Sequence, residues 1–289
     1  MGGSVFSNFF HQKGRNMANK IELDEKSWER QTITNRFMFY KIFTSNHELC
    51  RRLLEILLGM RISRIKMPEG EKGFESDVES HSIRVDIFTE DEKHIYDIEM
   101  QTTNDEDLPE RARYYQGMMD VSTLKHSEPY SFLKDSIVIF ICLSDPFGRK
   151  KARYIFRNLD TEDGKELGDR TSKIFFNAAM YGKIKGDEEL RALLEYFFSG
   201  KAESGFTSSL EKQVGMARRN TEWRHGYMTM ERMKYYAARR AAAQGFMKGA
   251  AKQKAEDEKI LAKMTAQKDA MNAEIQRLMA KVAELENRK

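Results

Sequence analysis

The spacing of hydrophobic residues predicts that the folded part of the chain begins with helices. An apolar segment at residues 35–43 is followed over residues 49–57 by apolar side chains at three- and four-residue spacing, as one face of a helix requires. Residues 45–48 have the composition of an N-cap, and Gly59 is placed to end the helix. The alternating segment 61–66 then predicts a short strand, followed by a polar loop from Pro68 to Ser76.

Two neighbouring segments alternate with a period of two and predict a β-hairpin. They cover residues 82–88 and 96–101, and a short polar link at residues 89–94 joins them. Alternate side chains of a strand point to opposite faces. The second strand therefore has one apolar face and one face that carries Asp97, Glu99 and Gln101.

The next part of the chain continues the alternation of helices and strands. A helix is expected at residues 107–125, and the uninterrupted apolar run 137–143 predicts a strand buried on both faces. Two further strands are expected at residues 153–156 and 173–177, before a helix at residues 188–199. The resulting order, helix–three strands–helix–strand (αβββαβ) with added strands, predicts an α/β (α+β) fold.

The C-terminal part of the chain is predicted to be helical. Residues from about 208 to 240 follow a helical pattern, and the chain from residue 251 contains no proline or glycine. A heptad seam marks this tail and predicts a coiled coil that would form a homodimer through residues 257–287. A single amphipathic helix folded back on the domain is the alternative. The seam consists of Leu261, Met264, Lys268, Met271, Ile275, Leu278, Val282 and Leu285.

Composition narrows the class of protein only slightly. The 289 residues are 40% hydrophobic with a net charge of +4, which by itself does not indicate a nucleic-acid partner. Cys50 and Cys142 lie in apolar runs, which indicates buried thiols in a reducing, cytoplasmic compartment. No apolar run reaches the length of a membrane span, and no membrane partner is expected.

The acids of the hairpin suggest a metal site. Asp86 in the first strand and Glu99 in the second would share a Mg²⁺ or Mn²⁺ ion if both side chains point the same way. The backbone carbonyl of Met100 is a candidate third ligand, and Gln101 would orient an attacking water molecule. Asp97 lies on the same face, and either takes part in the metal site or only lies next to it. The competing interpretation is that all these acids are solvated on the open face of an antiparallel hairpin.

Two basic elements lie outside the hairpin and would suit DNA. The first turns of the helix at residues 107–125 carry Arg111 and Arg113, which would contact phosphates together with Tyr115. Core packing is the alternative role for the tyrosines. Residues 211–240 hold eight basic against three acidic side chains with aromatic residues between them, typical of a phosphate-tracking surface and equally of a solvated helix face.

These segments together resemble a known family. Residues 84–87 (RVDI), 96–101 (YDIEMQ) and 108–116 (LPERARYYQ) are similar to the PD-(D/E)XK nuclease family transposases of the bacterial recombination-promoting nuclease group. The resemblance implies a restriction-endonuclease-like αβββαβ core and a Mg²⁺-dependent DNA endonuclease. It assigns Asp86 and Glu99 to the metal and puts Gln101 where the wider superfamily has lysine. Asn35 and Arg36 depart from the pattern, because the family often has an acid there.

The sequence therefore predicts four segments: a mobile N-terminus at 1–30, a nuclease-like domain at 31–205, a basic helical extension at 206–250 and a coiled-coil tail at 251–289. The expected function is metal-dependent hydrolysis of DNA, linked to DNA mobility or recombination, in the bacterial cytoplasm and on the nucleoid when DNA is bound. The alternatives are a degenerate homologue that binds DNA without cutting it, and an interaction protein that acts through its tail.

Overall fold

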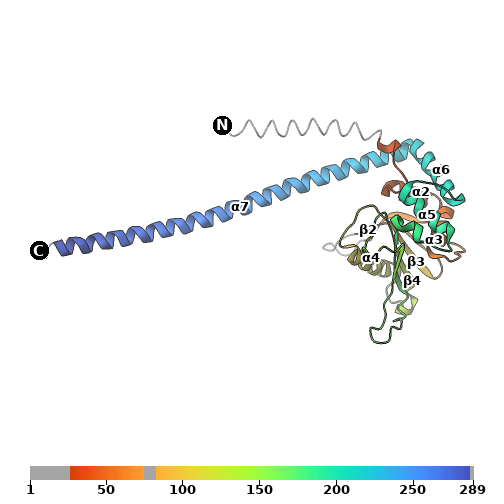
Figure 1. Ribbon diagram of the computed structural model, residues 1–289, viewed down its shortest axis with the longest axis horizontal. Helices are drawn as coiled ribbons and strands as arrows, with labels where there is room; N and C mark the ends of the chain where they lie inside the picture. The colour runs from red at the N-terminus through yellow and green to blue at the C-terminus, as the bar shows by residue number, and fades with distance from the viewer. Residues whose placement is uncertain (1–26, 75–82, 287–289) are drawn as a thin grey trace. The chain divides into compact units, whose positions relative to one another are not determined.

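A six-stranded mixed sheet lies at the centre of the first part of the chain (Figure 1), and the order of its strands is β1-β2-β3-β4-β6-β5. The computed structural model describes residues 27–74 and 83–286. Strands β1, β2 and β3 are antiparallel, β3, β4 and β6 run parallel, and β5 is antiparallel to β6. The strands are β1 (Glu69–Phe74), β2 (Ile83–Glu90), β3 (His94–Gln101), β4 (Asp135–Cys142), β5 (Arg153–Phe156) and β6 (Thr171–Asn177).

The helices complete the predicted αβββαβ order, which the structure confirms. The chain also divides into two compact units, with the boundary between residues 227 and 228 inside α7. Two 3₁₀ turns lie at Tyr130–Phe132 and Ala178–Lys183. The helices are α2 (Arg36–Ser45), α3 (His47–Leu58), α4 (Leu108–Thr123), α5 (Glu188–Ser199), α6 (Gly205–Arg219) and α7 (Thr221–Glu286).

Side-chain caps fix where the first helices begin. Asn35 accepts a hydrogen bond from the Met38 amide at the start of α2, at 3.1 Å. Asn46 caps α3 in the same way, and this N-cap confirms the prediction made from residues 45–48. Gly59 ends α3 in the left-handed conformation at φ 65°, which glycine adopts without steric penalty.

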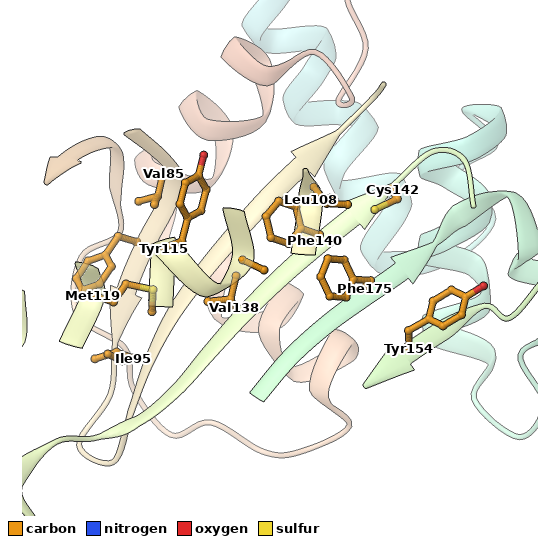
Figure 2. Close-up of a cluster of buried hydrophobic side chains, with 12 residues drawn as sticks. Val85, Ile95, Leu108, Tyr115, Met119, Val138, Phe140, Cys142, Tyr154 and Phe175 are labelled. Carbon is orange, nitrogen blue, oxygen red and sulfur yellow. The ribbon is translucent and has the colours of Figure 1, made fainter. Parts of the chain in front are cut away.

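The core on one face of the sheet lies between the strands and α4 (Figure 2). Leu108, Ala112 and Met119 of α4 are buried against Val138 and Phe140 of β4. Strand β4 is buried on both faces over most of its length, as its uninterrupted apolar run predicts. Ile95 of β3 belongs to the same cluster and points to the same face of its strand as Asp97 and Glu99, so α4 lies over the face that carries the acids.

The strand predicted at residues 61–66 is wrong. That segment has no regular structure, and β1 (Glu69–Phe74) lies instead inside the predicted polar loop. Ile62 and Ile65 are buried, so these apolar side chains pack in the core although their backbone forms no β-strand. The Lys66 amide donates a hydrogen bond to the Glu90 carbonyl at 2.8 Å, which ties the segment to the end of β2.

The helical pattern predicted for residues 208–240 is confirmed, and the structure divides it into two helices, α6 and α7. The chain breaks at Asn220, whose side chain accepts a hydrogen bond from the Trp223 amide at 2.9 Å and so starts α7. Gly226 lies inside α7, where a Cβ atom would come within 3.1 Å of the Phe37 ring. This glycine therefore serves close packing and does not interrupt the helix.

The segment just before α2 belongs to the core. The predicted mobile segment 1–30 lies mostly outside the described residues, but Trp28 is described and fully buried. Its indole donates a hydrogen bond to the Arg218 carbonyl at 3.0 Å, and its ring lies 5.2 Å from that of Tyr227. Tyr227 and the Arg218 backbone, both in the predicted basic extension, thus take part in packing.

The tail is one continuous helix through the predicted coiled-coil seam. The seam side chains from Leu261 to Leu278 are exposed in the single chain, with Leu261 at 65% and Ile275 at 47%. The side chains of Val282 and Leu285 lie outside the described set. Among the helices described, none combines the length and apolarity needed to cross a bilayer.

Candidate functional site

Asp86 and Glu99 lie where β2 and β3 separate, and Asp97 lies in the paired part of β3, opposite Phe88. The ladder between these strands ends at the pair Ile87–Ile98, although both strands continue beyond it. The next residues, Asp86 and Glu99, bridge the gap with side chains: the Asp86 amide donates to Glu99 Oε1 at 2.7 Å, and the Met100 amide donates to Asp86 Oδ2 at 3.0 Å. The two carboxylates predicted to meet are therefore held together by backbone amides.

These acids are buried, so the interpretation of a solvated open face is wrong. Asp86 and Asp97 are 0% exposed, Glu99 is 2% exposed and Gln101 is 7% exposed. The register places Glu99 beside Phe140, which belongs to the core under α4. Alternation alone could not reveal this, because a helix covers the polar face. Buried carboxylates are costly unless protons, cations or hydrogen bonds compensate them.

Asp97 is the least compensated of the acids. Neither of its carboxylate oxygens accepts a hydrogen bond from any donor in the described part of the chain. Burial, and next the charge of Asp86, raise the pKa of Asp97 well above its usual value. Burial and the charges of Asp86 and Asp97 raise the pKa of Glu99 in the same way. Asp97 and Glu99 therefore retain protons to a higher pH than exposed carboxylates do.

Arg36 supplies a cation that the sequence did not predict for this site. It is the first residue of α2, and its Nε donates to Asp86 Oδ1 in an ion pair. Burial alone would lower the pKa of Arg36, but the charges of Asp86 and Glu99 outweigh it and raise the pKa. Its side chain is 45% exposed, whereas that of Asp86 is 1% exposed. Where the family often has an acid, this chain thus has an arginine that pairs with Asp86, the proposed metal ligand.

Arg111 approaches the site from α4, as the sequence suggests. Its Nη2 lies 3.9 Å from Glu99 Oε2, and its Nη1 donates to Gln101 Oε1 at 3.3 Å and to Asp105 Oδ2 at 2.8 Å. The guanidinium also lies over the ring of Tyr115, 5.6 Å from its centroid. This arginine therefore connects the acids to the loop that follows β3.

Gln101 is engaged by the same loop. Its amide nitrogen donates to the Thr103 carbonyl and to Asp105 Oδ2, each at 2.8 Å. Its amide oxygen accepts the bond from Arg111. In this arrangement the amide holds the loop, and it would have to release one of these partners to orient a water molecule.

The two other residues predicted to contact DNA differ in exposure. Arg113 has an exposed side chain on α4. Tyr115 is 9% exposed, and its ring stacks on Phe140 with centroids 6.3 Å apart. Its hydroxyl accepts a hydrogen bond from Arg111 at 3.4 Å. The core role that the sequence left open for one tyrosine therefore falls to Tyr115, while Tyr114 is 40% exposed.

The donor set fits a hard divalent cation held by few protein ligands. In the described part of the chain, no group of three or more His, Cys, Asp or Glu side chains is placed to hold a metal. Mg²⁺ needs fewer, because it keeps several waters and takes one or two carboxylates. Asp86 and Glu99 provide two adjacent carboxylates, and the buried Asp97 beside them has two oxygens that no donor in the described part of the chain satisfies.

Comparison with known families identifies the chain. A match to the PD-(D/E)XK nuclease family transposases covers residues 33–248, and the chain belongs to this family. The mixed sheet with its αβββαβ order is consistent with the PD-(D/E)XK fold. Nucleases of this type generally use divalent metals, and a nuclease family implies DNA as its substrate. Comparisons with curated proteins and with solved structures gave no match.

Proposed function

We propose that the protein is a Mg²⁺- or Mn²⁺-dependent DNA endonuclease that hydrolyses phosphodiester bonds and takes part in DNA mobility or recombination. The observation that carries the proposal is the buried pair Asp86–Glu99 at the point where β2 and β3 separate. A purely structural hairpin would not gain from two carboxylates buried side by side, because their repulsion and desolvation destabilise the fold. Such a cost is typical of functional sites.

Each site residue has a defined part in the proposed reaction. Asp86 and Glu99 hold the cation, with the Met100 carbonyl as a further oxygen donor. When bound, the cation makes a water molecule more acidic and stabilises negative charge on the phosphate. Gln101 orients the attacking water after releasing a loop partner. Arg111, already 3.9 Å from Glu99, binds a phosphate oxygen of the substrate.

DNA contact outside the site is assigned to exposed basic side chains. Arg113 is exposed on α4 and would bind a phosphate, and the hydroxyl of Tyr115 would act through Arg111. The proposed location is the bacterial cytoplasm, with the protein on the nucleoid when it binds DNA. DNA binding without cleavage is the second candidate, favoured by the ion pair that Arg36 makes with Asp86.

The tail supports self-association in addition. Exposed apolar side chains recur at heptad positions over Leu261, Met264, Met271, Ile275 and Leu278, and an isolated helix gains nothing from them in water. We propose a homodimer through residues 257–287. A protein whose tail alone acts, without nuclease activity, is the alternative that this seam also fits.

Plasmid nicking tests the proposed function. Supercoiled DNA is incubated with the full chain in Mg²⁺, in Mn²⁺ and in EDTA, alongside Asp86→Asn and Glu99→Gln. Both substitutions are expected to abolish nicking, as EDTA does. Arg52→Gln is the matched control, because Arg52 pairs with Glu189 away from these acids. Equal nicking by all variants would refute the site, and a salt-sensitive mobility shift without nicking would favour the binding protein.

A further inference from the structure

Both oxygens of the Asp86 carboxylate have hydrogen-bond partners within the chain. The Met100 amide donates to Oδ2 from the backbone of β3, and Arg36 Nε donates to Oδ1 from the first turn of α2. Each carboxylate oxygen has a further lone pair, but a divalent cation at Asp86 would compete with the positive charge of Arg36 for this carboxylate. The amide is fixed by the strand, whereas Arg36 is a long side chain that is 45% exposed. Arg36 is therefore the partner that can leave.

The charge at the site leads to the same residue. Three buried acids, Asp86, Asp97 and Glu99, lie close to two guanidinium groups, Arg36 and Arg111. With both arginines in place, an added divalent cation meets positive charge at short range, which is repulsive in a buried environment. Once Arg36 leaves Asp86, the same cation replaces one positive charge by two.

Arg36 would need another anion after it leaves. A phosphodiester is the group that this site would hold if it cleaves DNA, and a guanidinium binds phosphate oxygens through charge-assisted hydrogen bonds. The side chain starts at the N-terminus of α2, where the backbone amides also favour negative charge. Gln101 cannot supply a cation to the phosphate, because its side chain is a neutral amide.

We propose that Arg36 is an internal counter-cation that competes with the divalent metal for Asp86 and moves to a phosphate when DNA binds, so that metal and DNA bind cooperatively. The inference rests on the proposed function, because it takes Asp86 as a metal ligand and DNA as the substrate. In this proposal Arg36 affects the metal through Asp86 and contacts DNA through a phosphate. An arginine at residue 36 makes metal binding depend on DNA, whereas an acid at this position would be a further metal ligand.

Isothermal titration of Mn²⁺ into the full chain tests the competition without any cleavage. Arg36→Gln is expected to bind Mn²⁺ at least about tenfold more tightly than the unmodified chain, because one nearby positive charge is removed. Arg36→Lys keeps the charge and is expected to stay close to the unmodified chain. Arg52→Gln is the matched control and should change nothing. Thermal unfolding of each variant establishes that it is folded.

A second titration, with an excess of a short DNA duplex, tests the coupling. DNA is expected to tighten Mn²⁺ binding to the unmodified chain more than to Arg36→Gln, since binding free energies are linked reciprocally. If Arg36→Gln binds Mn²⁺ no more tightly while Asp86→Asn loses binding, the role of Arg36 is overturned and the metal site stands. If Asp86→Asn binds Mn²⁺ as the unmodified chain does, the proposed function is overturned as well.

Arg36→Lys is the fallback if Arg36→Gln does not fold. Because lysine keeps the positive charge, Mn²⁺ affinity equal to that of the unmodified chain supports the competition. Tighter Mn²⁺ binding by Arg36→Lys than by the unmodified chain overturns it.

Discussion

Replacing Glu99 by glutamine should stabilise the metal-free protein while removing its affinity for metal. The glutamine oxygen can still accept the Asp86 amide bond, which is 2.7 Å long. Its amide group can donate to Asp97, whose oxygens have no donor in the described chain and whose carboxyl lies within hydrogen-bonding reach of Glu99. The substitution thus removes one buried charge and satisfies a neighbouring acceptor.

The magnitude follows from the burial of the acids. Replacing buried charged groups by uncharged ones of similar volume stabilises proteins by about 1–4 kcal/mol. The lost attraction to Arg111, 3.9 Å from Glu99, offsets part of this gain. We therefore expect the lower half of that range, which raises the melting temperature by roughly 2–10 °C for a domain of this size.

The pH dependence of this gain has a defined sign. Because the pKa of Glu99 is raised in the folded state, the folded protein holds a proton that the unfolded chain releases from about pH 4 upward. Folding stability is therefore lost as the pH rises through the folded-state pKa. The Glu99→Gln variant should gain most at pH 8 and little at pH 4.

Chemical denaturation at both pH values, with EDTA present, measures the effect. Glu55→Gln is the matched control, because Glu55 accepts hydrogen bonds from Arg51, Arg52 and the Ile62 amide. These partners outweigh burial and lower the pKa of Glu55, so its loss should destabilise the protein at pH 8. A Glu99→Gln variant that is less stable than the unmodified chain at pH 8 would refute the reasoning.

Three further predictions concern other parts of the molecule. Burial raises the pKa of Asp120 from 3.8 to about 6, although the charge of Lys173 opposes the shift. Asp120→Asn should therefore stabilise the fold by about 1–2 kcal/mol above pH 6 and have no such effect below pH 4. Chemical denaturation at the two pH values measures the difference. A Cβ atom on Gly70 would lie 2.7 Å from Tyr40, so Gly70→Ala should cost about 1–3 kcal/mol, measured by thermal unfolding. Ile275→Glu should halve the mass found by light scattering, because it puts a charge at an apolar position of the seam. Lys268→Gln should leave the mass unchanged, because the seam is already polar at residue 268.

Local pattern predicted much of the fold. The alternation in β3, the N-cap at Asn46 and the apolar run of β4 each report a constraint within a few residues, and the structure has all three. The position of β1 could not be found this way. Its sequence, EGEKGF, is polar and glycine-containing, and it becomes a strand because β2 offers a free edge for pairing.

The environment of the acids was also beyond local pattern. Alternation places Asp97 and Glu99 on one face, but it cannot tell whether water or α4 covers that face. The ion pair between Arg36 and Asp86 joins residues 50 positions apart, and no spacing rule connects α2 to the middle of β2. Both features depend on how helices pack on the sheet.

The most direct measurement is anomalous scattering from crystals of the full chain soaked in Mn²⁺. We predict an anomalous peak between the carboxylates of Asp86 and Glu99, at about 2.1–2.3 Å from an oxygen of each, with Arg36 withdrawn from Asp86. The Met100 carbonyl and bound waters would complete the coordination. Crystals with an intact ion pair between Arg36 and Asp86 and no peak beside Glu99 at millimolar Mn²⁺ would contradict the account.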